Sequence, residues 1–153
     1  MSASASRLST AQLYQLQPQL MKSLLALGEA AAQALEAPLV HLVKLRVSQL
    51  NGCAFCMQLH AAEARKEGEA QLRLDLLAAW RETELFSMRE QAALSWAESL
   101  TLLAATKEVS EAVYQQTSQQ FSAEELASLT ALTIEINGWN RIAVSFYARI
   151  PPR

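Results

Sequence analysis

Apolar residues recur every three or four positions along much of this chain, which is the spacing that places them on one face of an α-helix. The stretch PLVHLVKLRVSQL, residues 38–50, shows it early in the chain. A later stripe of the same kind is formed by Leu126, Leu129, Leu132, Ile136 and Trp139. The pattern predicts amphipathic helices.

Prolines, glycines and capping residues mark where these helices begin and end. Pro18 and Pro38 suit a first helical turn, and Gly52 and Gly68 suit a helix end. Ser87 with Glu90, and Ser122 with Glu125, have the spacing of capping boxes. The predicted helices are about 18–35, 38–50, 53–67, 72–80 and 87–104, one starting at Ser110, and a long one starting at Ser122 that Gly138 is a candidate to bend.

Chain length and composition complete the fold prediction. With only four glycines and four prolines among 153 residues, helices are favoured over a sheet. A chain of this length buries enough surface to fold without a disulfide or a metal. We therefore expect an all-α fold, a single-domain bundle of about six to seven helices covering residues 1–153.

The charge pattern bears on partners and location. The net charge is −2 and no basic run occurs, so neither nucleic acid nor an anionic membrane is an expected partner. The N-terminal segment MSASASRLST lacks the apolar region of a signal peptide, and no apolar run is long enough to span a bilayer. The expected location is the cytoplasm, where a CxxC pair is more often catalytic or metal-binding than a static bridge.

The stretch NGCAFCMQLH, residues 51–60, carries the candidate chemistry. Cys53 and Cys56 fall in the first turns of a predicted helix, and a helix N-terminus favours a thiolate. His60 lies one turn beyond Cys56 on the same face, where it can accept the thiol proton. The two cysteines are three residues apart, close enough for a disulfide if the first turn relaxes.

His41 is a weaker candidate on the preceding helix. If helices 38–50 and 53–67 form a hairpin, His41 and His60 reach similar heights above the turn, at about 1.5 Å per residue. His41 is then placed to share a proton relay with His60 and Cys56, provided that the two faces meet.

Two other interpretations of the cysteines remain open. With His41 and His60 they make a Cys₂His₂ set, but three of those ligands fall on one helix and span about 10 Å of its axis, which disfavours zinc. They can also be two inert core residues, because cysteine is often fully buried. No metal and no bound cofactor are expected.

The segment PLVHLVKLRVSQLNGCAFCMQLH resembles the core motif of the alkyl hydroperoxidase D / carboxymuconolactone decarboxylase superfamily, with the core at about residues 38–67. RLDLLAAWRETELFSMREQAALSWAESLT and INGWNRIAVSFYARIPP are similar to its small single-domain members. The resemblance implies a helical fold assembled as trimers or hexamers, and hydroperoxide reduction through the cysteine pair. By that pattern Cys56 attacks the peroxide, Cys53 resolves and His60 belongs to the relay.

The chain departs from that pattern twice. The relay carboxylate of the family falls twelve residues before the first cysteine, where this chain has His41. The peroxidase proper carries a histidine between its cysteines, where this chain has Phe55. A histidine still relays protons, but its charge responds differently to pH.

Two functions follow. The first is a thiol-dependent peroxidase, with a hydroperoxide as substrate and an external dithiol as electron donor. The alternative is acid–base chemistry on a small lactone or keto acid, as in the decarboxylase branch, which needs no cysteine pair. The residues Asn137, Trp139, Asn140 and Arg141 suit an interface, a pocket mouth or simple packing, and they are not assigned to the site.

Overall fold

The structure, a computed structural model, describes residues 6–152 and consists there of helices without a strand. The α-helices are α1 (Thr10–Leu16), α2 (Pro18–Ala32), α3 (Ala37–Leu50), α4 (Ala54–Lys66), α5 (Gln71–Leu76), α6 (Met88–Thr101), α7 (Leu103–Thr106), α8 (Glu111–Gln120) and α9 (Ala123–Ser145). A 3₁₀-helix, η1 (Leu77–Glu82), follows α5. The prediction of an all-α fold is confirmed.

The capping signals fix the helix starts that they predicted. Both capping boxes form: Ser87 Oγ accepts from the Glu90 amide, and Ser122 Oγ accepts from the Glu125 amide. Ser110 caps α8 through the Val113 amide. Each cap satisfies an amide that the helix itself leaves unpaired.

The number of helices differs from the prediction. Within residues 6–152, α1 is an extra helix, started by a capping box of Ser9 with Gln12, and none of its residues is buried. The predicted helix 87–104 is broken at Leu102 into α6 and α7. The predicted helix 72–80 changes into η1 after Leu76. α9, in contrast, continues through Gly138.

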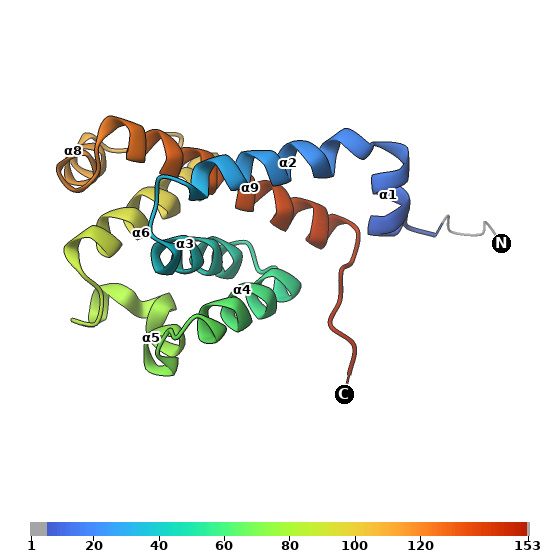
Figure 1. Ribbon diagram of the computed structural model, residues 1–153, viewed down its shortest axis with the longest axis horizontal. Helices are drawn as coiled ribbons and strands as arrows, with labels where there is room; N and C mark the ends of the chain where they lie inside the picture. Colours follow the sequence, from blue (N-terminus) through green and yellow to red (C-terminus); the bar gives the residue numbers. More distant parts are fainter. Residues whose placement is uncertain (1–5, 153) are drawn as a thin grey trace.

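Two layers of helices enclose the core (Figure 1). α2 and α9 lie side by side along one layer, and the α3–α4 hairpin lies beneath them. One cluster of buried apolar side chains joins α2, α3, α6 and α9, and a second joins α3, α4, α5, η1 and α6. The chain after α9 descends past the start of α4 (Figure 1).

The turn between α3 and α4 is tied to α9 through side-chain amides. Gly52 adopts a φ of +65°, which suits a residue without a Cβ. The Asn51 amide group donates to Asn137 Oδ1 at 3.0 Å and to Asn140 Oδ1 at 2.9 Å, and Asn140 Nδ2 donates to Ser48 Oγ at 3.0 Å. These bonds hold the start of α4 in place, and they account for Asn137 and Asn140 of INGWNR.

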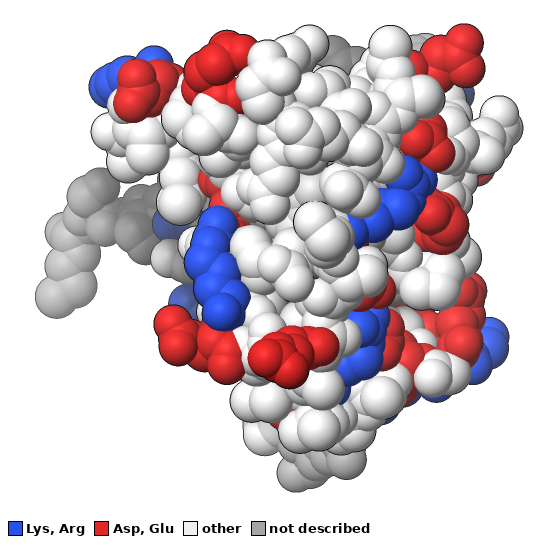
Figure 2. Space-filling model, turned by 90° about the vertical axis from the view of Figure 1, so that its left-hand side faces the viewer, with Lys and Arg blue, Asp and Glu red and all other residues white. Residues whose placement is uncertain are grey.

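The surface carries both signs of charge. On the face shown in Figure 2, acidic and basic side chains alternate along the margins of a central uncharged area. Among the residues described, no helix has the length and apolar character that a membrane crossing demands.

Candidate functional site

Cys53 and Cys56 form a disulfide at the start of α4. Cys53 is the N-cap residue and Cys56 lies in the first turn, with their Cα atoms 5.3 Å apart. Both are buried, with 2% and 4% of their surface exposed. Ala143 of α9 and Ala148 pack against them.

The two cysteines line different hollows. Cys56 lines a cavity of about 600 Å³ together with His60. Cys53 lines a second hollow of about 430 Å³, formed with Gly52, Tyr147 and Ile150 among others. The disulfide therefore lies between two openings, and Cys56 is the cysteine that shares its cavity with a potential base.

The cavity beside Cys56 is mostly apolar with a few polar groups. Its apolar wall comes from α1, α2, α4 and α9, through Tyr14, Leu25, Phe55, Leu59, Trp139 and Ile142. Its polar groups include Lys44, His60, Glu63 and Glu135. A mostly apolar cavity with a few convergent polar groups is the usual form of a small-molecule site.

Burial favours the neutral form of His60. It is 7% exposed, and its Nδ1 lies 3.0 Å from Glu63 Oε2. Burial lowers the pKa of His60, Lys44 and His41 lower it further, and Glu63 opposes the change. A neutral imidazole that donates from Nδ1 to Glu63 keeps Nε2 as an acceptor for a thiol proton.

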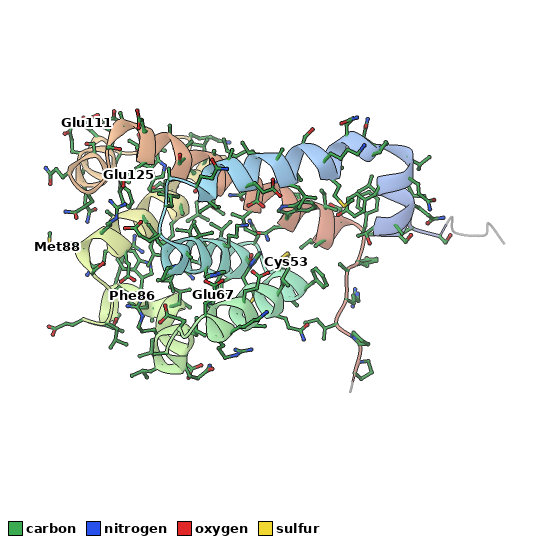
Figure 3. All side chains as sticks on the ribbon, viewed as in Figure 1. Cys53, Glu67, Phe86, Met88, Glu111 and Glu125 are labelled. Atoms are coloured by element: carbon green, nitrogen blue, oxygen red, sulfur yellow. A yellow bond between two sulfur atoms is a disulfide. The ribbon has the colours of Figure 1, made fainter. Side chains whose placement is uncertain are left out.

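Among the residues described, His41 approaches this site at Glu63, at a distance too long for a hydrogen bond. Its Nε2 lies 2.8 Å from Glu67 Oε2, and its Nδ1 lies 3.9 Å from Glu63 Oε2. Glu63 thus stands between the two histidines. His41 lines a separate small hollow with Glu67, away from the Cys56 cavity. Figure 3 shows Cys53 and Glu67 at opposite ends of α4.

Three polar residues of the site were missed by the sequence reasoning. Glu63 lies three residues after His60, so helical spacing alone was a usable signal. Lys44 and Glu135 come from α3 and α9, and their Nζ and Oε1 atoms are 3.3 Å apart. Their meeting depends on how α9 packs across the hairpin, which spacing along the chain does not reveal.

Within residues 6–152, no three side chains of His, Cys, Asp or Glu are grouped as a metal ion requires.

Comparisons with known proteins give a family. The sequence profile of the carboxymuconolactone decarboxylase family matches residues 18–99. An uncharacterized protein of Bacillus subtilis (strain 168), YdfG, is 35% identical over 133 residues, which are 86% of this chain and 90% of YdfG.

Solved structures agree with this assignment. A protein of unknown function from Agrobacterium tumefaciens, for which a role as the antioxidant defence protein AhpD has been proposed, superposes with a TM-score of 0.86 at 33% identity. The superposition covers 95% of this chain and all of that one. The debrominase Bmp8 superposes with a TM-score of 0.72 at 14% identity, over 99% of this chain and 93% of its own, and this likeness shows the fold alone.

Proposed function

Because the chain belongs to the carboxymuconolactone decarboxylase family and has an alkyl hydroperoxidase D-like fold, we propose that it is a thiol-dependent peroxidase that reduces hydroperoxides through Cys53 and Cys56. One observation carries the proposal. Cys56 is half of a disulfide and lines the cavity that also holds His60, whereas Cys53 lines the hollow on the other side.

The first step is attack by Cys56. In the reduced protein His60 takes the proton of the Cys56 thiol, and the thiolate attacks the outer oxygen of the hydroperoxide. The O–O bond breaks, Cys56 becomes a sulfenic acid, and the leaving alkoxide takes a proton from His60 to give an alcohol. The start of α4 assists, because a helix N-terminus stabilises a thiolate.

The second step returns the pair to the disulfide seen here. The Cys53 thiol attacks the sulfenic sulfur of Cys56, and the sulfenic oxygen leaves as water. An external dithiol then reduces the disulfide and is itself oxidised to a disulfide. The hollow at Cys53 offers that dithiol an approach separate from the peroxide cavity.

Glu63 and His41 serve this reaction by holding and passing the proton. The Glu63 carboxylate fixes the His60 ring through Nδ1 and stabilises the imidazolium that forms. His41 bonds to Glu67, which is half exposed, but its Nδ1 lies 3.9 Å from Glu63 Oε2, so a bridging water or a small movement of Glu63 must complete the path to the surface. His41 thus takes part through Glu63 and not by contact with Cys56.

Thiol counting tests the proposal directly. One equivalent of cumene hydroperoxide added to the reduced protein is expected to remove both thiols and to yield an intramolecular disulfide. Cys53→Ser is expected to stop at a sulfenic acid on Cys56, detected by mass spectrometry. Cys56→Ser is expected to lose the fast reaction. A sulfenic acid on Cys53 in the complementary variant would reverse the two roles.

The same measurement separates the alternative function. His60 and Glu63 form an acid–base pair without help from the cysteines, so chemistry on a small lactone or keto acid would survive Cys53→Ser and Cys56→Ser alike. The acid–base function would be favoured over the peroxidase by two results together. The double cysteine variant would be fully active on such a compound, and the wild type would consume no peroxide.

A further inference from the structure

Two exposed arginine side chains meet at the rim of the Cys53 hollow. The guanidinium carbon of Arg7 lies 3.7 Å from the centroid of the Tyr147 ring, and that of Arg149 lies 4.6 Å from it, so the two cations are at most about 8.3 Å apart, the sum of these distances. Arg149 lines both hollows, but Tyr147 lines the Cys53 hollow and not the Cys56 cavity. The stacking therefore places the Arg149 guanidinium group on the Cys53 side.

These two cations have no anionic partner in the part of the chain that the structure describes. Across residues 6–152, no carboxylate forms an ion pair with Arg7 or Arg149. The side chains around the Cys53 hollow include no acidic one. Arg7 donates to the Ser145 carbonyl at 2.9 Å, where the C-terminal end of α9 favours one cation. That contact leaves the charge of Arg149 uncompensated, in a chain whose net charge is −2.

This arrangement suits an anion of moderate size. Two guanidinium groups held this close repel each other, and an anion beside them offsets that repulsion. Stacking on the Tyr147 ring orients both groups, because the face of an aromatic ring attracts a cation. A guanidinium group binds a carboxylate through two parallel hydrogen bonds. The hollow of about 430 Å³ has the size of a small-molecule site, so the ligand is a small organic carboxylate.

The segment that carries Arg149 also covers the disulfide. Cys53 is 2% exposed, and Ala148 packs against the cysteine pair. A molecule that reacts with the disulfide therefore needs residues 147–150 to move aside. Segments close to a chain end open locally at low cost in free energy. A ligand bound by Arg149 is held on the part of the chain that moves, next to the sulfur that the movement exposes.

We propose that Arg149, assisted by Arg7, binds a carboxylate of the electron donor, so that the donor is a small anionic dithiol. The role of this molecule as a donor rests on the proposed peroxidase function, whereas the anion subsite rests on the two arginines and Tyr147.

The reaction at the subsite is a thiol–disulfide exchange. One donor thiolate attacks Cys53 Sγ, the Cys53–Cys56 bond breaks, and Cys56 leaves as a thiolate. The second donor thiolate then displaces Cys53, and the donor becomes a cyclic disulfide. Overall the donor loses two electrons and two protons, and the two cysteines take them up as thiols.

Two dithiols of different charge test the proposal. 2,5-Dimercaptoadipate carries two carboxylates, its bis(dimethylamide) is neutral, and both close to a cyclic disulfide when they are oxidised. The measurement is the rate constant for reduction of the Cys53–Cys56 disulfide by each compound, without any peroxide present. The quantity compared between variants is the ratio of the anionic to the neutral rate constant, in which the intrinsic reactivity of each compound cancels.

In Arg149→Gln this ratio is expected to fall about three- to fivefold, as the loss of an exposed ion pair implies. Arg149→Lys keeps the charge and is expected to keep most of the ratio. Arg65→Gln is the matched control, because it removes the same charge from an exposed arginine in the last turn of α4, and it is expected to leave the ratio unchanged. Added salt is expected to lower the ratio more in the wild type than in Arg149→Gln, since salt screens the ion pair.

An equal ratio in the wild type and in Arg149→Gln would overturn the proposal. An equal fall in Arg65→Gln, or a disulfide that neither dithiol reduces, would overturn it as well. If the protein reduces no peroxide but the ratio depends on Arg149, the peroxidase function fails and the anion subsite stands. If peroxides are reduced and the ratio is indifferent to Arg149, the subsite fails alone.

Discussion

At the scale of single residues, the site has a division of labour that follows from burial and partners. Cys56 and His60 share one cavity, and Glu63 orients the histidine. His60 is buried more deeply than Glu63, whose side chain is 45% exposed, so burial governs the histidine while the carboxylate remains in contact with solvent. The pKa of His60 is lowered as a result, which favours the neutral imidazole that can accept a proton.

This arrangement predicts the pH dependence of thiol reactivity. Since burial lowers the pKa of His60, the neutral imidazole persists below the ordinary histidine value of about 6.5. Alkylation of Cys56 in the reduced protein is therefore expected to keep its histidine-assisted rate at neutral pH and to lose it only when the pH falls below about 6.5.

The measurement is the rate of Cys56 alkylation against pH, in Cys53→Ser to isolate one thiol. His60→Gln is expected to remove the histidine-dependent step and leave the thiol to titrate by itself. A step centred above pH 7 in the wild type would mean that Glu63 outweighs burial at His60.

A second prediction at this scale concerns the link between the histidines. His41→Ala and Glu63→Gln are each expected to slow peroxide reduction by about ten- to a hundredfold, the lower range for one proton-transfer group. Because His41 meets His60 only through Glu63, the double variant is expected to be little slower than Glu63→Gln alone.

If the rate losses of His41→Ala and Glu63→Gln multiply in the double variant, His41 acts by a route other than Glu63. His41→Glu is the matched variant, since it places at this position the carboxylate that the family resemblance implies, and it is expected to retain activity. Equal rates in the wild type, His41→Ala and His41→Glu would reduce His41 to a packing residue.

The sequence placed candidate residues close together where they lie on one helix, and their catalytic roles stay predictions. Cys53, Cys56 and His60 are brought together by the geometry of α4, which spacing describes. Cys53 and Cys56 form a disulfide, and their redox role stays a prediction. Glu135 could not be predicted from the sequence because its place in the site depends on the packing of α9 against α2 and α3.

At the scale of helices, local sequence signals predicted where α6 and α9 begin, but they did not predict α1 or the break at Leu102. The capping boxes of α6 and α9 were predictable because each involves four consecutive residues. α1 escaped prediction because none of its residues is buried, so it shows no apolar stripe. The break at Leu102 carries neither glycine nor proline, the usual marks of a helix end.

The turn that starts α4 offers a test of how the helices support the site. Asn51→Ala removes two hydrogen bonds and leaves Asn140 Oδ1, on a residue 1% exposed, without its donor. The variant is expected to lower the free energy of unfolding by about 1–3 kcal/mol, the cost of an unsatisfied buried polar group.

Urea unfolding of the disulfide form measures this loss. Arg141→Ala is the control: it removes another donor to Asn137, but from an exposed side chain, and a change within about 0.5 kcal/mol is expected. Equal stabilities of Asn51→Ala and the wild type would show that the amide network does not hold the turn.

At the scale of the whole molecule, the apolar faces that the sequence showed have two different fates. The residues of LVHLVKLRV lie on α3, which is buried by α4, α6 and α9 on several sides, so its apolar character is used within the chain. α9 is different: Ile134 is 56% exposed and Val144 is 48% exposed, although both belong to the same helix as the core stripe. Leu25 and Met21 of α2 are also exposed.

From this surplus of exposed apolar side chains we predict a homo-oligomer, and the family resemblance implies a trimer or hexamer. Ile134→Glu places a charge where a subunit contact would bury it, and it is expected to shift the protein towards monomer because an unpaired buried charge is costly. Ala127→Glu adds the same charge at an exposed position of α9 and is expected to leave assembly intact. Sedimentation velocity at micromolar concentration measures both.

A monomeric wild type would refute the oligomer. If Ile134→Glu leaves the oligomer intact, the subunit contact does not involve this part of α9. Charged substitutions of the exposed Leu102 and Leu103, at the α6–α7 break, would then be tested next.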